Sequence, residues 1–208
     1  MRHKITSLFL LATLLGMSWV HATTFLQDQQ LPELVEESER AVRAMVVAVA
    51  YGYDENLLPS TTVTLRVEDV IYGADLPEPG QTFRIKVFGA PEPMEDGLHW
   101  FITGTPKYQP GERYLLLLLG RSKWGFTNTA GLPFGAFRLT EGLDGSSLAL
   151  SLAGNRLALG PEGLRSWLPE NVTLSLPVDP AEAVPYLLLR RAVADLWIDR
   201  GGELRMTP

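Results

Sequence analysis

Short apolar segments with the spacing of β-strands constrain the fold of this chain more than any other feature of its sequence. Residues 61–72 and 82–88 alternate apolar and polar side chains, a pattern typical of strands with one buried face. Residues 42–51 and 112–119 are almost continuously apolar, which predicts strands buried on both faces. The 19 glycines and 15 prolines favour many turns. The sequence therefore predicts a mainly β protein.

Further segments complete this pattern and add helices at both ends of the predicted domain. Strands are also expected at residues 124–129, 134–140 and 172–176, and in a hairpin formed by residues 147–152 and 156–159. A helix is expected at residues 32–40. A second helix is expected near the C-terminal end, starting either at the capping-box-like residues 179–182 or at Pro185, and stopped by Gly201 and Gly202. Five or six strands with a long connection at residues 89–111 favour a small closed or partly closed barrel.

The first 22 residues have the three-part layout of a secretory signal peptide. Arg2 and Lys4 give a basic start, residues 5–20 form an apolar run, and residues 20–22 end in the small Ala22. The run is shorter than the roughly 20 residues of a membrane-spanning helix. We therefore expect cleavage after Ala22, no stable membrane span afterwards, and a mature protein in the periplasm or outside the cell.

The cysteine and histidine content restricts the chemistry of the mature chain. The sequence has no cysteine and three histidines, of which only His99 would remain after cleavage. Such a chain cannot build a thiolate or histidine-rich zinc site, and it has no cysteine nucleophile. Common hydrolase, dinucleotide-binding and P-loop motifs are also missing. We expect no metal, no cofactor and no catalytic residue; the alternative left open is a hydrolase-type enzyme that uses His99 with nearby carboxylates.

The charge of the chain argues against nucleic acid as a partner. The formal net charge is −6, and the basic signal peptide contributes none of the acidic residues. Phosphate backbones select positively charged surfaces. Arg66, Arg84 and Lys86 are expected on the outer face of two paired strands, where cross-strand pairing with Glu68 or its neighbours accounts for them.

The connection at residues 89–111 contains the aromatic residues Trp100, Phe101 and Tyr108. Loops carried on a rigid frame commonly hold functional residues, and tryptophan and tyrosine are favoured at binding hot spots. The alternative is that these side chains plug one end of a barrel, and their exposure distinguishes the two possibilities. We take Trp100, Phe101 and Tyr108 as candidate partner-binding residues.

Three short elements share their spacing with a known group of proteins. The first element is Ser38-Glu39, just before the first strand. The second is residues 67–73 at the end of the second strand, with Tyr72 where a lysine is usual. The third is residues 111–114 (GERY), which open a central apolar strand. Over residues 34–139 the chain resembles a loose group of exported bacterial proteins of largely unknown function. It also resembles the netrin-like superfamily, which includes the tissue inhibitors of metalloproteinases. The resemblance implies an OB-like barrel.

The same resemblance implies one way of binding a partner. Netrin-like inhibitors place their N-terminal amine and carbonyl on the zinc ion of a target protease. Thr23 would stand at that terminus after cleavage, followed by Thr24. The resemblance therefore adds Thr23 and Thr24 to the candidate contact residues and an exported zinc protease to the candidate partners.

These observations predict three parts of the chain and one function. The parts are a signal peptide at residues 1–22, an OB-like β-barrel domain at residues 23–145, and a C-terminal hairpin and helix at residues 146–208 that packs on the barrel. The expected function is that of an exported, non-enzymatic binding protein, with protease inhibition as one form of it. A structural component of the cell envelope is the remaining alternative.

Overall fold

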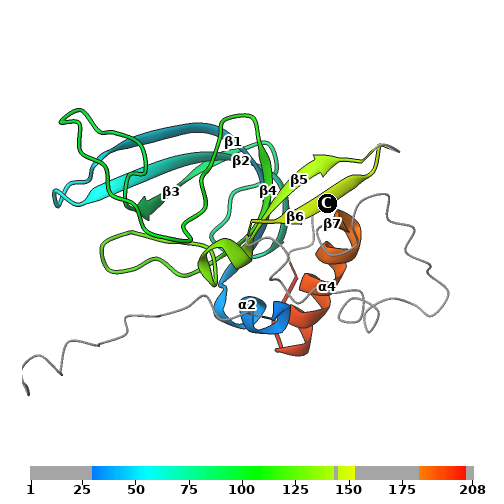
Figure 1. Ribbon diagram of the computed structural model, residues 1–208. Coiled ribbons are helices and arrows are strands. Elements are labelled where there is room, and N and C mark those ends of the chain that lie inside the picture. Colours follow the sequence, from blue (N-terminus) through cyan, green and yellow to red (C-terminus); the bar gives the residue numbers. More distant parts are fainter. Residues whose placement is uncertain (1–29, 143–144, 153–182, 205–208) are drawn as a thin grey trace, which may run out of the picture.

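The computed structural model describes residues 30–142, 145–152 and 183–204, whose arrangement is shown in Figure 1. In chain order, the elements are α2 (Leu31–Glu37), β1 (Arg40–Tyr53), β2 (Pro59–Tyr72), β3 (Thr82–Phe88), β4 (Arg113–Leu118), the 3₁₀-helix η1 (Leu132–Gly135), β5 (Ala136–Glu141), β6 (Ser147–Ser151), β7 (Ala183–Pro185) and α4 (Tyr186–Asp199). The prediction of a mainly β protein is confirmed. The predicted strands at 156–159 and 172–176, the signal-peptide segment, Thr23 and Thr24 lie outside the described residues.

The seven strands form one sheet in the order β3-β2-β1-β4-β5-β6-β7, and each neighbouring pair is antiparallel. The sheet ends at β3 on one side and at β7 on the other. Pairing between the described strands therefore does not close a barrel, contrary to the closed form that the strand count favoured. The reason is that β5, β6 and β7 continue the sheet beyond β4, so the two edge strands do not meet.

The longest strands, β1 and β2, form a hairpin whose turn is held by the Asp54 carboxylate. This group accepts hydrogen bonds from the backbone N–H groups of Asn56 and Leu58, both at 2.9 Å. Register shifts along the hairpin mark bulges that increase its twist. β4 pairs with β1 only over the residues Arg40–Met45, so the second half of β1 has β2 as its one strand neighbour in the described sheet.

Apolar side chains pack on both faces of the sheet and form two hydrophobic clusters. Strand β4 contributes to both, since Leu115 and Leu117 join one cluster while Leu116 and Leu118 join the other. This explains the continuous apolar run and confirms the prediction that the strand is buried on both faces. The Leu115 cluster fills the space between the sheet and the helices α2 and α4, which lie side by side in Figure 1.

The two helices differ in how well the sequence predicts their ends. Helix α4 follows Pro185 directly, which is one of the two starts that the sequence left open. Helix α2 ends at Glu37 rather than at residue 40, because Ser38 adopts an extended conformation and begins the approach to β1. The Ser38 hydroxyl bonds to the Val35 carbonyl at 3.1 Å and to the Tyr72 hydroxyl at 2.5 Å. These contacts fix the end of α2 against the last residue of β2.

The segment at residues 124–135 departs from the predicted strands. Phe126 and Thr129 form isolated bridges with β3 and β4, respectively, instead of a continuous strand. Residues 132–135 form η1 after Gly131, which has a left-handed φ of 56°. The strand predicted at 134–140 therefore begins only at Ala136. Within the described ranges, no helix is both long and apolar enough to cross a membrane.

Candidate binding surface on the 89–111 loop

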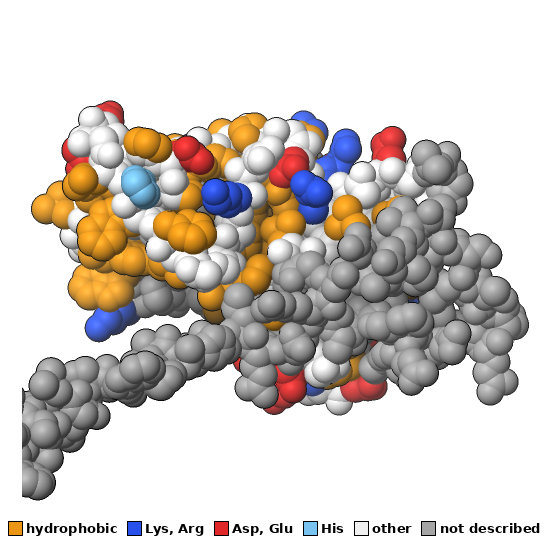
Figure 2. Space-filling view, viewed as in Figure 1, with side chains coloured by type: hydrophobic (Ala, Val, Ile, Leu, Met, Phe, Trp, Pro, Cys, Tyr) orange, Lys and Arg blue, Asp and Glu red, His pale blue; other side chains and the backbone are white. Residues whose placement is uncertain are grey.

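The structure separates the three aromatic candidates of the 89–111 loop. The side chains of Trp100 and Phe101 are 53% and 56% exposed, and Ile102 beside them is 37% exposed. Tyr108, in contrast, is only 5% exposed. Trp100, Phe101 and Ile102 therefore form an apolar surface, hereafter the Trp100 surface, whereas Tyr108 packs inside the fold. Figure 2 shows hydrophobic side chains gathered at the end of the molecule away from α4.

Hydrogen bonds join the Trp100 surface to the residues that follow β3 and, through Gly89, to β2. Ala90 and Trp100 exchange two such bonds, at 2.9 and 2.7 Å. The Thr61 hydroxyl on β2 donates to the carbonyl of Gly89 at 2.6 Å. Gly89 has a φ of +98°, and a Cβ there would lie 3.0 Å from the Trp100 carbonyl oxygen. Glycine is therefore required both by the backbone conformation and by the close approach of the two chain segments.

A small apolar pocket with a cavity volume of about 20 Å³ lies beside the Trp100 surface. Its lining includes Tyr51 of β1, Phe88 of β3 and Pro106 of the loop, together with Trp100 and Phe101. Apolar pockets lined by aromatic side chains are the usual anchor points of partner residues. The pocket has room for little more than a water-sized group, so it would shield only the tip of a partner's apolar side chain from water.

Tyr108 forms part of the inner wall of this pocket. Its ring meets that of Tyr114 edge to face, with centroids 5.5 Å apart. Its buried hydroxyl has no hydrogen-bond partner within 3.5 Å among the described residues. Burial raises the pKa of the Tyr108 hydroxyl well above its usual value, and the nearby Thr129 hydroxyl only partly offsets this effect. Tyr108 is therefore a packing residue of the fold and lies beneath the Trp100 surface rather than on it.

His99 lies next to Trp100 but has a different environment. It is exposed, and within the described part of the chain it has no hydrogen bond or ion pair. The described residues also contain no group of three or more acidic or histidine side chains that could hold a metal ion. A general base is usually oriented by a neighbouring acid, and no such contact reaches His99 here. The structure therefore adds no support to the hydrolase alternative.

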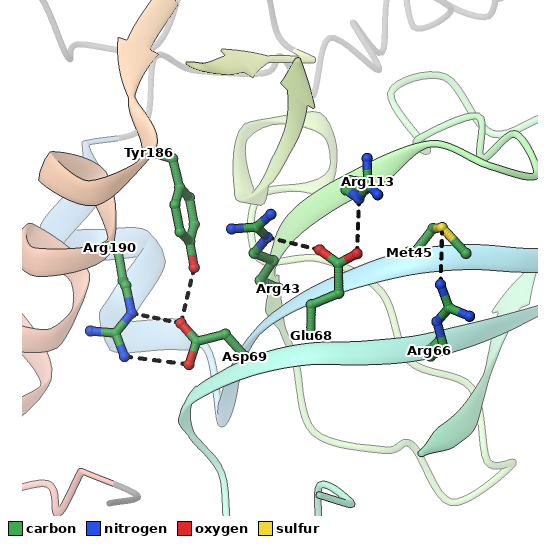
Figure 3. A network of polar contacts seen from close by, with 8 residues as sticks. All are labelled: Arg43, Met45, Arg66, Glu68, Asp69, Arg113, Tyr186 and Arg190. Atoms are coloured by element: carbon green, nitrogen blue, oxygen red, sulfur yellow. Dashed lines mark hydrogen bonds and ion pairs between the residues drawn. The ribbon is translucent and has the colours of Figure 1, made fainter. Parts of the chain in front are cut away.

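A network of charged side chains, which sequence reasoning missed, joins α4 to the sheet (Figure 3). Asp69 of β2 accepts hydrogen bonds from Arg190 at 2.6 Å and from the Tyr186 hydroxyl at 3.0 Å. Burial acts to raise the pKa of the Asp69 carboxyl, but Arg190 and Tyr186 outweigh it and the pKa is lowered. The guanidinium of Arg43 lies 4.8 Å from the centre of the Tyr186 ring. The network fixes the start of α4 on the sheet.

The outer-face pairing expected from the sequence is only partly present. Glu68 has cross-strand partners, but they are Arg43 of β1 and Arg113 of β4, each at 2.8 Å, rather than Arg66. Arg66 contacts the sulfur of Met45 instead, as Figure 3 shows. Lys86 pairs with the turn residues Asp54 and Glu55, both at 2.9 Å. Arg66 lies on the same strand as Glu68, and the β2–β3 register places Lys86 opposite Thr62, so neither side chain lies across from Glu68.

Comparison with known proteins gives no independent identification. No family model, no curated protein and no solved structure matches the chain.

Proposed function

We propose that this chain is an exported, non-enzymatic binding protein that contacts a protein partner through the Trp100 surface. The observation that carries the proposal is the exposure of Trp100 and Phe101, each more than half exposed on a loop that backbone bonds hold in place. Large aromatic side chains on a preorganised loop lose little conformational entropy on binding and bury much apolar area. The adjacent pocket would receive the tip of an apolar side chain of the partner.

An OB-like arrangement of the first four strands belongs to the same proposal. Besides the ladder β3-β2-β1-β4, the segment at residues 126–130 contacts both β3 and β4. The Thr127 N–H donates to the carbonyl of Lys86 at 2.8 Å, and the Ala130 N–H donates to that of Leu117 at 2.8 Å. The bridge to β3 is parallel and the bridge to β4 is antiparallel. These contacts support a partly closed barrel of four strands and one irregular segment, with the 89–111 loop at one end.

Photo-crosslinking tests the binding function. A photo-reactive phenylalanine analogue placed at position 101 should capture a discrete partner from the exported fraction of the native cells. The same analogue at position 187 is the control, because Leu187 is also exposed, at 73%, but lies on α4. Trp100→Ala should weaken capture about tenfold or more, as expected for an interface hot spot of ~2 kcal/mol. Equal capture from both positions, or capture unaffected by Trp100→Ala, would contradict the proposal.

Inhibition of an exported zinc protease is the specific form of binding that the netrin-like resemblance suggests. It requires the free amine of Thr23, so the chain starting at Thr23 should inhibit such a protease and a chain with one extra residue should not. Both forms are titrated against a panel of zinc proteases. If neither form inhibits any of them, the inhibitor role is excluded and the binding role at Trp100 is judged by crosslinking alone.

A further inference from the structure

The second half of β1 has an open edge. β4 covers β1 as far as Met45, and the last contact on that side is at Val46, which bonds to the backbone of Gly111 and Glu112 at 2.8 and 2.9 Å. Between the described segments, no further backbone hydrogen bond reaches this side of β1 over residues 47–53. Residues 48–53 are paired on one side only, by β2, and Val47 is bulged without a partner in the register.

The turn of the hairpin determines which backbone groups point to this open edge. The Asp54 N–H donates to the carbonyl of Leu58 at 2.9 Å, so Asp54 faces β2. In an antiparallel ladder the direction of the backbone groups alternates from residue to residue. The N–H and C=O groups of Val49, Tyr51 and Tyr53 therefore point away from β2. A row of unpaired donors and acceptors of this kind is a template for another strand.

The sequence of this edge lacks two of the features that normally prevent strand addition, namely charged side chains and proline. Natural edge strands are usually protected by lysine, by proline or by being short. Residues 44–53 contain no charged residue and no proline. Val47 and Tyr53 are 45% and 44% exposed. The bulge at Val47 marks the point where the neighbouring strand β4 ends and the open edge begins.

The apolar pocket adjoins the open edge because Tyr51 belongs to both. When a peptide adds to an edge, alternate side chains lie on the same face as those of the strand it joins. A side chain opposite Tyr51 would thus point toward the pocket beside Trp100 and Phe101.

Charge around the edge distinguishes between possible occupants. The adjoining loop carries Glu92, Glu95 and Asp96, all exposed, and the Tyr53 hydroxyl donates to Asp96 at 2.6 Å. The cation nearest the pocket is Lys107, which lies 5.7 Å from the Phe101 ring centre. A second copy of this chain would bring the same acidic group to the interface and be repelled. A segment with basic side chains would be attracted.

We propose that an extended, basic segment of the partner adds as a strand to residues 47–53 of β1 and inserts the tip of an apolar side chain beside Trp100. This inference rests on the proposed binding function and specifies the partner's chemistry. Backbone hydrogen bonds to Val49, Tyr51 and Tyr53 supply the affinity that does not depend on partner sequence, while the pocket and the acidic loop select the side chains.

A random decapeptide display library, selected on the full chain, tests this proposal. Enriched peptides should alternate apolar and polar residues, carry more Lys and Arg than Asp and Glu, and slow amide hydrogen exchange at Val49 and Tyr51 at least tenfold. Val49→Pro removes one outward N–H without removing a bond to β2, and should weaken binding at least tenfold. The exchange measurement on the unmodified chain keeps the test valid if this variant unfolds.

Charge reversal supplies a matched control. Glu92→Lys with Glu95→Lys should weaken the enriched peptides several-fold, whereas Glu36→Lys with Glu37→Lys, the same change at exposed positions on α2, should not. Peptides that require Trp100 but leave the Val49 and Tyr51 amides unprotected would overturn strand addition and leave the proposed function standing. Acidic peptides, no enriched peptide, or self-association of the chain through this edge would also overturn it.

Discussion

Asp69 on β2 and Arg190 on α4 are 121 residues apart in the sequence and form an ion pair at 2.6 Å. The contact joins a helix at one end of the chain to a strand near the other. Arg190 uses two nitrogen atoms, the second at 3.4 Å from the other carboxylate oxygen, so the helix is fixed in orientation as well as in position.

Replacing Asp69 should destabilise the fold in a pH-dependent way. Asp69→Asn should lower the free energy of unfolding by about 1–2 kcal/mol at pH 7, because it removes a charged hydrogen-bond acceptor. The pKa of Asp69 in the folded protein lies below its usual value of 3.8. The stability that the ionised Asp69 carboxylate contributes is therefore fully present above pH 3.8 and is lost as the pH falls through the folded-state pKa. Urea unfolding from pH 7 to pH 3 should show the free energies of unfolding of the two proteins converging at low pH.

The matched control is Asp195→Asn, at the exposed ion pair between Asp195 and Arg191. This change should alter the free energy of unfolding by less than ~0.5 kcal/mol.

Two leucines on α4 should differ sharply in their contribution to stability. Leu189 is fully buried in the cluster between the sheet and the helices, and Leu189→Ala should cost about 2–5 kcal/mol through lost burial and the cavity left behind. Leu187, two residues earlier, is 73% exposed, and Leu187→Ala should change stability by less than ~0.5 kcal/mol. Chemical denaturation measures both, and similar losses would mean that α4 does not pack as described.

Gly80 and Gly89 both have a positive φ, but only Gly89 lies close to another part of the chain. Replacing each by alanine therefore distinguishes the cost of backbone strain from the cost of a steric contact. Gly89 and Gly80 have φ values of +98° and +90°, but a Cβ at Gly80 would meet nothing within 4 Å. Gly80→Ala should therefore cost only the conformational strain, about 1 kcal/mol. Gly89→Ala should cost more and should change the fluorescence of Trp100, because the new methyl group contacts the Trp100 carbonyl. Equal costs and an unchanged spectrum would contradict the Ala90–Trp100 contact.

Removing the hydroxyl of Tyr108 and removing that of Tyr114 should affect the free energy of unfolding differently. Tyr108→Phe removes a buried hydroxyl without a described partner within 3.5 Å, so stability should stay within ~0.5 kcal/mol or rise. Tyr114→Phe removes contacts with the Glu112 carboxylate and the Lys107 carbonyl and should cost about 1–2 kcal/mol. The two variants differ from the parent by the same single atom, and thermal unfolding compares them. A larger loss at Tyr108 would indicate a partner for its hydroxyl.

The strands were predictable where burial leaves a local pattern. Residues 82–88 are buried on one face and alternate, whereas β4 is buried on both faces and is continuously apolar. The order of the strands leaves no such pattern, because β1 pairs with β4 across some 60 residues of intervening chain that include β2 and β3. Predicting that β5, β6 and β7 extend the sheet would have required knowledge of these long-range pairings.

The candidate site was predictable only as a set of residue types. The sequence places three aromatic residues in one loop, but nothing local distinguishes the exposed Trp100 from the buried Tyr108, since neither lies in a periodic segment. The open edge of β1 has an even weaker signal. The apolar run at residues 42–51 predicts burial, which is wrong for its second half: from Val47 on β1 is partly or fully exposed, because β4 pairs with β1 only as far as Met45.

Strand β7 and helix α4 meet at Pro185 with no connecting residue between them. Pro185 pairs with Leu148 of β6, and Tyr186, the first residue of α4, bonds to Asp69. Without a linker, α4 cannot rotate away from the sheet unless β7 also leaves β6. The two should therefore open in a single step, and the amides of β6 that face β7 should exchange with solvent at the same rate as those of α4. A force applied at the end of α4 would be carried directly into the sheet edge.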